Sequence, residues 1–239
     1  MKPPFQISKI LFFVCYLIVV IISAFYDKTY LKFMLPFTLS FIVLFYYANK
    51  KNKDLSFGLS MIALMICDYS IFSDMMTNFY MVCISISLFF IAICIALKNY
   101  FINTRLPWSK LISLSFFISI GLVLYLIISI SAMIYQLIPN AVPFIVLAVL
   151  PLLANIIITY YIYVSDRYKF GGINLLFSSC LFILAVVLTP INELFYPSPV
   201  FTIFIASAQL IGVYIFTNFL VEMKPSKEKE VPINLAEAF

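Results

Sequence analysis

Asp68 is the acidic residue of this sequence that lies well inside a long apolar stretch, within residues 60–72. An ionisable side chain at membrane depth is energetically costly, so it normally faces the interior of a helix bundle and marks a functional site. Desolvation favours its neutral form unless a partner or water stabilises the anion. The chemistry that Asp68 offers is therefore acid catalysis or proton-linked transfer.

Amide and hydroxyl side chains accompany this carboxyl in other apolar stretches. Gln209 lies near the middle of the last stretch, between small residues. Asn174 and Ser178 are four residues apart, as are Asn155 and Thr159, so each pair shares a helix face. Such groups serve either interhelical hydrogen bonding or a binding site, and the sequence leaves both interpretations open.

Histidine is absent from the sequence, which excludes Ser-His-Asp hydrolysis, histidine zinc sites and haem ligation by histidine. The five cysteines all fall in apolar stretches, without the paired spacing of metal sites or disulfide frameworks. We therefore expect no metal and no cofactor. The cysteines are Cys15, Cys67, Cys83, Cys94 and Cys180.

The composition is that of a membrane protein. Hydrophobic residues make up 64% of the chain and charged residues 10%, with a mean hydropathy of +1.11. Soluble domains carry about 25% charged residues. Apolar runs of 18 or more residues without strand-like alternation indicate transmembrane α-helices rather than a barrel. The predicted fold class is thus all-α, a polytopic bundle.

Polar punctuation divides residues 1–221 into eight predicted spans that form one transmembrane domain, and residues 222–239 form a polar tail. The connections between the spans are short and leave no room for a soluble domain. Two of them, residues 138–143 and 189–199, are rich in proline and are predicted to be turns that end helices. The predicted spans are residues 7–25, 31–48, 55–72, 78–97, 110–130, 142–164, 172–189 and 199–221.

The basic residues predict the orientation. Of the 15 lysines and arginines, all but Lys28 and Lys32 fall on the side of the membrane that holds both termini. The positive-inside rule places that side, and the tail, in the cytoplasm, which in a bacterium makes this an inner-membrane protein. The net charge of +5 therefore reflects topology, and we expect neither a nucleic acid nor a soluble protein as partner.

Three segments resemble the YhhN family of membrane proteins, which includes the lysoplasmalogenases. The segment Ala63-Leu-Met-Ile-Cys67-Asp68 resembles the family's apolar-Gly-Asp segment, with Cys67 in place of glycine. Residues 172–185 resemble its Gly-apolar-Phe-x-x-Ser-Asp-x-Leu-x-Ala segment, and residues 205–211 its Tyr-x-x-Ala-Gln-x-Leu-Ile segment. The three segments follow in the family's order, and eight spans are the family's usual number.

This resemblance implies hydrolysis of the vinyl-ether bond of lysoplasmalogen-type lipids. Asp68 would be the catalytic acid, and Gln209 with Asn174 or Ser178 would bind the substrate or orient water. The chain departs from the family pattern at the second aspartate, which Cys180 or Leu181 replaces depending on register, and at a histidine usual on the fourth span.

These departures keep two alternatives open. One is a catalytically inactive relative that binds a membrane lipid, a lysolipid or an isoprenoid. The other is a small proton-linked transporter that uses Asp68, for which the sequence shows neither inverted repeats nor a pair of broken helices.

Overall fold

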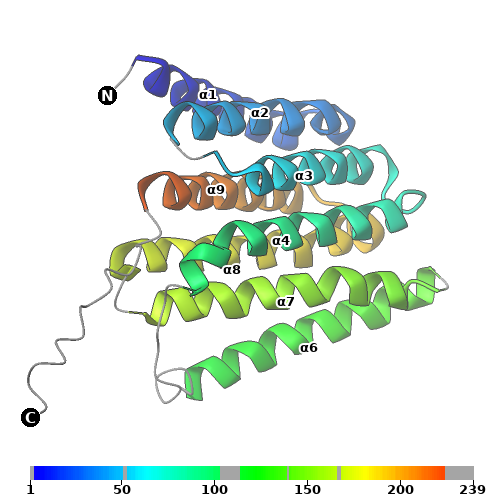
Figure 1. Ribbon diagram of the computed structural model, residues 1–239. Helices are drawn as coiled ribbons and strands as arrows, with labels where there is room; N and C mark the ends of the chain where they lie inside the picture. The colour runs from blue at the N-terminus through cyan, green and yellow to red at the C-terminus, as the bar shows by residue number, and fades with distance from the viewer. Residues whose placement is uncertain (1–2, 51–52, 103–113, 139, 166–167, 224–239) are drawn as a thin grey trace, which may run out of the picture.

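A computed structural model describes residues 3–50, 53–102, 114–138, 140–165 and 168–223. Throughout these residues the regular structure is helical and no strand occurs (Figure 1). The elements in chain order are α1 (Pro3–Phe25), η1 (Lys28–Tyr30), α2 (Leu31–Asn49), α3 (Leu55–Asp74), α4 (Phe79–Ile102), α6 (Leu114–Leu137), α7 (Val142–Val164), α8 (Lys169–Pro190), the π-helical turn η3 (Ile191–Phe195) and α9 (Pro199–Glu222).

Seven helical stretches in the described residues are long and apolar enough to cross a membrane, as the composition predicts. They comprise α1, α2 with η1, α3, α4, α7, α8 with η3, and α9. Helix α6 has 24 residues, of which the segment Gly121–Leu137 counts as a further apolar helix. The chain is therefore a multi-pass helical membrane protein.

The helices pack as a flattened ring. Neighbours in the ring are α1 and α2, α2 and α3, α3 and α4, α4 and α7, α7 and α8, α8 and α9, and finally α9 and α1. Helix α6 packs sparsely against α7 and α8, and lies at the edge of the bundle beside α7 (Figure 1). The start of α1 and the end of α9 lie at the same end of the bundle.

The first and last helices close this ring through aromatic and polar contacts. The rings of Phe12 and Tyr214 stack with centroids 5.4 Å apart. Tyr16 on α1 donates a hydrogen bond of 3.2 Å from its hydroxyl to Ser207 Oγ on α9. Ring closure thus depends on residues about 190 positions apart in the sequence.

Lys50, which follows α2, holds the C-terminal end of α9. Its ammonium group donates to the backbone carbonyl of Leu220 and to the hydroxyl of Tyr100, and that hydroxyl donates to the carbonyl of Met223 at 2.8 Å. The last carbonyls of a helix lack intrahelical partners and favour a nearby cation. Burial lowers the pKa of Lys50, and nearby Asp54 opposes that shift.

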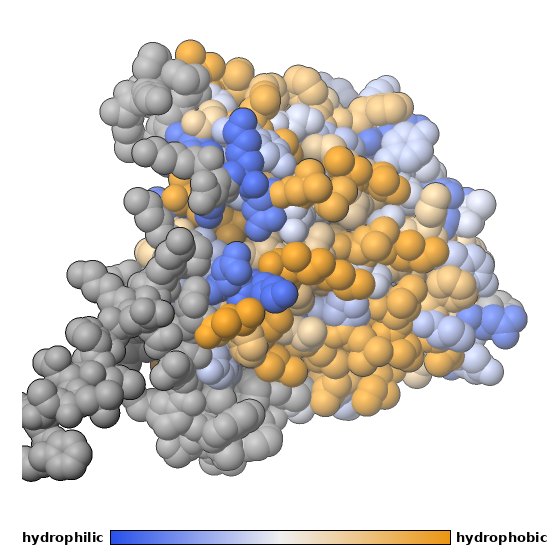
Figure 2. All heavy atoms as spheres, in the orientation of Figure 1, coloured by the Kyte–Doolittle hydropathy of each residue, from blue (hydrophilic) through white to orange (hydrophobic). Residues whose placement is uncertain are grey.

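Side chains on the outside of the bundle match a lipid environment. Figure 2 shows hydrophobic residues over the middle of the helices on this face and hydrophilic residues toward the two ends. Large apolar side chains point outward from every long helix, among them Phe33, Ile62, Leu88, Leu150 and Phe204. Lipid tails rather than water must cover these surfaces.

Two predicted helix ends are wrong: α4 continues to Ile102 instead of ending at residue 97, and α6 continues to Leu137 instead of ending at residue 130. The predicted turn within residues 138–143 is confirmed, since Asn140 has a φ of 64° and α7 begins at Val142. In the other proline-rich connection, α8 runs through Pro190 and continues as η3 to Phe195. Residues 110–113 of the predicted fifth span and 224–239 of the tail lie outside the described residues.

Candidate functional site

Asp68 lies on the buried face of α3, with 1% of its surface exposed. The helix begins where Asp54 caps it, because the Asp54 carboxylate accepts a hydrogen bond from the backbone N–H of Ser56 at 3.0 Å. Thirteen residues separate the first residue of α3 from Asp68, which corresponds to about 20 Å along the helix axis. The carboxyl therefore sits in the half of the bundle nearer to the α3–α4 connection.

Gln209 on α9 is the hydrogen-bond partner of this carboxyl. Its amide nitrogen Nε2 donates to Asp68 Oδ1 at 2.7 Å and to Oδ2 at 2.8 Å. Gln209 is itself 7% exposed, and 141 residues separate it from Asp68 in the sequence. The structure thus brings together the two candidate residues that the sequence placed on different, distant spans.

An amide suits a carboxyl that gains and loses a proton. The NH₂ group donates to a carboxylate, and the amide oxygen accepts from the hydroxyl of a carboxylic acid. Unlike a lysine or an arginine, glutamine adds no charge that would hold Asp68 in its ionised form. The pair can therefore keep a hydrogen bond in both protonation states.

Ser178 and Asn174 on α8 are not hydrogen-bonded to this pair. Ser178 is fully buried and donates from Oγ to the backbone carbonyl of Gly212 on α9 at 2.8 Å. Gly212 is three residues beyond Gln209, so Ser178 lies about one helical turn from the amide. Asn174 is exposed, one turn nearer to the start of α8. A substrate-binding role for either residue remains a prediction.

Cys180 and Leu181 are the two positions at which the resemblance to the YhhN family would place a second aspartate, and their environments differ. Cys180 is exposed on the outside of α8. Leu181 approaches α9, since its Cβ would lie 3.4 Å from a Cβ added to Gly212. A carboxyl at the position of Leu181 would thus face α9, the helix that carries Gln209. A carboxyl at the position of Cys180 would point away from α9.

The second polar pair of the sequence contributes to helix packing. Asn155 on α7 donates from Nδ2 to Ser179 Oγ on α8 at 3.0 Å, whereas Thr159 donates to the carbonyl of Ile156 in its own helix. The carbonyl oxygen of the Asn155 side chain is buried without a partner. An unpaired buried acceptor costs free energy, so the Asn155 side chain stabilises the packing of α7 on α8 through its NH₂ group only.

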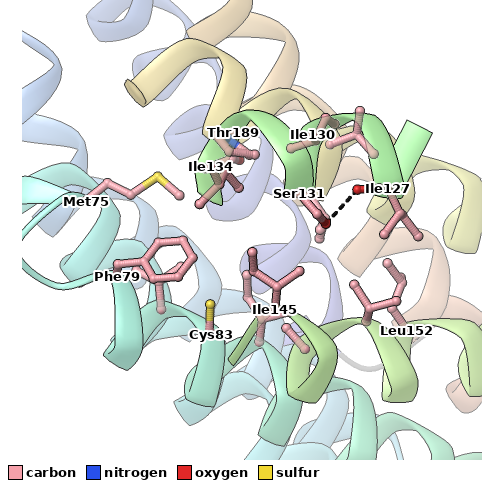
Figure 3. A pocket seen from close by; sticks show the side chains of 17 residues that line it. Met75, Phe79, Cys83, Ile127, Ile130, Ser131, Ile134, Ile145, Leu152 and Thr189 are labelled. Atoms are coloured by element: carbon pink, nitrogen blue, oxygen red, sulfur yellow. Dashed lines mark hydrogen bonds between the residues drawn. The ribbon is translucent and has the colours of Figure 1, made fainter. Parts of the chain in front are cut away.

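A cavity of about 90 Å³ lies between α6 and the ring helices α4, α7 and α8, with Met75 of the α3–α4 connection at its edge (Figure 3). Its lining is apolar except for two hydroxyls. Ser131 and Thr189 both donate to carbonyls of their own helices, at 2.7 Å in each case. Figure 3 shows Phe79 and Cys83 facing Ile134 and Ile145 across this space.

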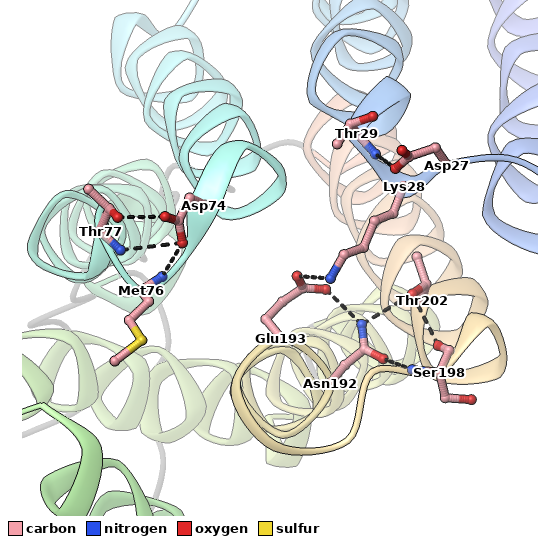
Figure 4. Close-up of polar contacts among 10 residues, drawn as sticks. All are labelled: Asp27, Lys28, Thr29, Asp74, Met76, Thr77, Asn192, Glu193, Ser198 and Thr202. Carbon is pink, nitrogen blue, oxygen red and sulfur yellow. Dashed lines mark hydrogen bonds and ion pairs between the residues drawn. The ribbon is translucent and has the colours of Figure 1, made fainter.

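A polar cluster that the sequence did not predict joins η1 to the α8–α9 connection (Figure 4). Lys28 Nζ donates to Glu193 Oε2 at 2.6 Å, and Glu193 is 6% exposed as a side chain. Asn192 Nδ2 donates to Glu193 Oε1 and to Thr202 Oγ1, and its Oδ1 accepts from the backbone N–H of Ser198. Lys28 is one of the two basic residues that the sequence predicts on the side opposite the termini, and that exceptional position was the available signal. Glu193 pairs with Lys28.

Within the described residues, no three histidine, cysteine, aspartate or glutamate side chains are grouped so as to hold a metal ion. The comparisons with known proteins give no match: no protein-family model matches the sequence, and neither does any curated protein or any protein of solved structure.

Proposed function

We propose that this protein is a divergent YhhN-like membrane hydrolase that cleaves the vinyl-ether bond of lysoplasmalogen-type lipids. The observation that carries this proposal is the buried hydrogen-bonded pair of Asp68 and Gln209. These are the two residues that match the family's aspartate and glutamine. The absence of a family match leaves the proposal resting on three short segments and on this pair.

Asp68 in its protonated form is the general acid of the proposed reaction. Its proton goes to the alkenyl carbon that is not bonded to oxygen, which forms a C–H bond and leaves an oxocarbenium ion. Water adds to that ion and gives up one proton to the Asp68 carboxylate, which restores the acid. The resulting hemiacetal breaks its bond to the glycerol oxygen, and the proton of its hydroxyl goes to that oxygen. The products are a long-chain aldehyde and a glycerophospho-base. Gln209 orients the carboxyl through the hydrogen bonds described above.

Aldehyde release from lysoplasmalogen by the purified protein tests this mechanism. We expect Asp68→Asn to lower the rate at least 100-fold, since positioned acid–base groups contribute about 10²–10⁴-fold. Asp74→Asn is the matched control, because Asp74 is an exposed residue of the same helix whose carboxylate accepts hydrogen bonds from the neighbouring residues Thr77 and Met76. Equal inertness of the wild type and Asp68→Asn toward lysolipids would end the hydrolase proposal.

The apolar cavity favours a second function, in which the bundle binds a lipid or an isoprenoid without turnover. Apolar cavities stay free of water and accept apolar ligands. The purified protein used for the aldehyde-release assay also distinguishes hydrolysis from binding alone. A lipid that co-purifies in stoichiometric amount and stays intact, as measured by mass spectrometry, supports binding alone.

We also propose eight membrane spans with both termini in the cytoplasm. Helix α6 supplies the eighth span, since its 24 residues give about 36 Å of helix for a hydrocarbon core about 30 Å thick. An even number of spans agrees with the start of α1 and the end of α9 lying at one end of the bundle. In a bacterium this is the inner membrane.

A further inference from the structure

The π-helical turn η3 lies at one end of the apolar cavity. Thr189 and Pro190, the two residues just before η3, line the cavity directly. The apolar residues of η3 are Ile191, Leu194 and Phe195, spaced three and four apart. They pack against the hydrophobic cluster that contains buried residues of the cavity wall, namely Met75, Phe79, Cys83, Ile130 and Ile134. The turn therefore covers the end of the cavity that is nearest to the α8–α9 connection.

The polar residues of η3 are held from two directions (Figure 4). Asn192 is fully buried and bonds to Glu193, to Thr202 Oγ1 and to the backbone N–H of Ser198, which all belong to the segment from η3 to α9. Lys28 comes from the α1–α2 connection instead, and within the described residues it ties this face of η3 to another part of the bundle. The lateral attachment of η3 thus depends on one ion pair.

The two members of this ion pair differ in exposure. The Glu193 side chain is 6% exposed and the Lys28 side chain 41%. Lys28 can therefore exchange the carboxylate for water, whereas Glu193 reaches water only if η3 moves outward. A buried charge that has lost its partner is strongly destabilising, so separation of the pair favours that movement.

We propose that the Lys28–Glu193 ion pair is a latch that holds η3 over the end of the apolar cavity. Apolar molecules of the membrane reach the cavity at this end when the pair separates. The latch controls access to the cavity and does not involve Asp68, so it is independent of whether the protein hydrolyses a lipid.

The thiol of Cys83 reports the opening of the latch, because it lines the cavity and is 6% exposed (Figure 3). The full-length protein in liposomes is treated with methyl methanethiosulfonate, a small uncharged thiol reagent. Mass spectrometry of its peptides then gives the labelling rate of each cysteine. Cys67 is the internal control, since it is 2% exposed in the main hydrophobic core and is not part of the cavity lining. General loss of the fold exposes both thiols, whereas movement of η3 exposes Cys83 alone.

We expect Lys28→Met to speed the labelling of Cys83 roughly tenfold or more and to leave Cys67 unchanged, because the variant leaves the Glu193 carboxylate without its cation. Lys28→Arg keeps the positive charge and should label like the wild type. Lys32→Met is the matched control, since it removes the other lysine of this end, whose Nζ lies 5.2 Å from the centroid of the Phe33 ring. It should also label like the wild type.

Unchanged labelling of Cys83 in Lys28→Met overturns the latch, and this includes a wild type that already labels fast through the sparse packing beside α6. Equal acceleration by Lys32→Met overturns it as well. If Lys28→Met speeds the labelling of Cys67 as much as that of Cys83, the variant has lost its fold. Glu193→Gln, which keeps the shape of the side chain, then decides, and any result other than selective acceleration of Cys83 overturns the proposal.

Discussion

Asp68 and Gln209 form a buried pair in which each side chain satisfies the other. The carboxyl needs a donor at membrane depth, and Gln209 Nε2 provides one to each of its oxygens. Removal of one partner leaves a buried polar group unsatisfied, which costs about 1–3 kcal/mol. Replacement of both partners by apolar groups of similar shape is close to neutral.

We therefore expect Gln209→Leu to lower the stability of the purified protein by about 1–3 kcal/mol, since it leaves the Asp68 carboxyl without its donor. Asp68→Leu combined with Gln209→Leu should recover most of that loss. Unfolding in mixed micelles, followed by circular dichroism, measures both variants. If the double variant is as unstable as Gln209→Leu, the pair does not act as a unit.

At the level of residues, the sequence named both members of the pair as candidate site residues but predicted neither the hydrogen bond between them nor its surroundings. A carboxyl and an amide at membrane depth must each find a partner, so their burial follows from composition. The rotation of α8 does not follow, because Asn174 and Ser178 share a face by spacing and yet only Ser178 is buried. Asn174 lies near the start of α8, where polar side chains reach the membrane surface.

Between elements, the backbone of one helix comes close to a glycine of the next where α8 begins against the end of α7. A Cβ added to Gly172 would lie 2.9 Å from Tyr163 Cα, which is backbone and cannot rotate away. Small residues permit such close contacts between transmembrane helices. The sequence of α8 therefore requires glycine here for packing.

Gly172→Ala should lower the stability by about 1–3 kcal/mol, as overpacking typically does. Gly121→Ala is the matched control, because a Cβ added to Gly121 meets nothing within 4 Å. The control should be neutral or slightly stabilising, since alanine favours helix more than glycine. The same unfolding measurement compares them, and equal stabilities would show that α7 and α8 separate at no cost.

Hydropathy located the helices but placed two of their ends wrongly. Helix α4 continues through the polar residues Lys98 and Asn99 to Ile102, and the residues after 130 stay mostly apolar, so a change of hydropathy marks neither helix end. Helix α8 ends at Pro190, one residue beyond its predicted end. The chain then continues as the π-helical turn η3, whose Asn192 and Glu193 are held by Thr202 and Lys28.

For the whole molecule, the distribution of charge makes the topology testable. Lys9 near the start of α1 and Lys50 after α2 lie on the predicted inner side, whereas Lys28 and Lys32 lie on the outer side. The positive-inside rule depends on such segregation of lysine and arginine rather than on net charge.

In a bacterial host, a fluorescent protein fused to the C-terminus should fold and fluoresce, because that terminus is predicted to be cytoplasmic. Alkaline phosphatase inserted after Thr77, between α3 and α4, should be active, because it requires export. Whole-cell fluorescence and phosphatase activity measure the two fusions. The opposite pattern would reverse the predicted orientation.

Closure of the ring by α9 has a consequence for biosynthesis. Gln209 is made 141 residues after Asp68, and the α9 residue that contacts Tyr16 of α1 is made 191 residues after Tyr16. Every truncated or stalled chain that stops before Gln209 therefore presents a carboxyl in the bilayer without its amide.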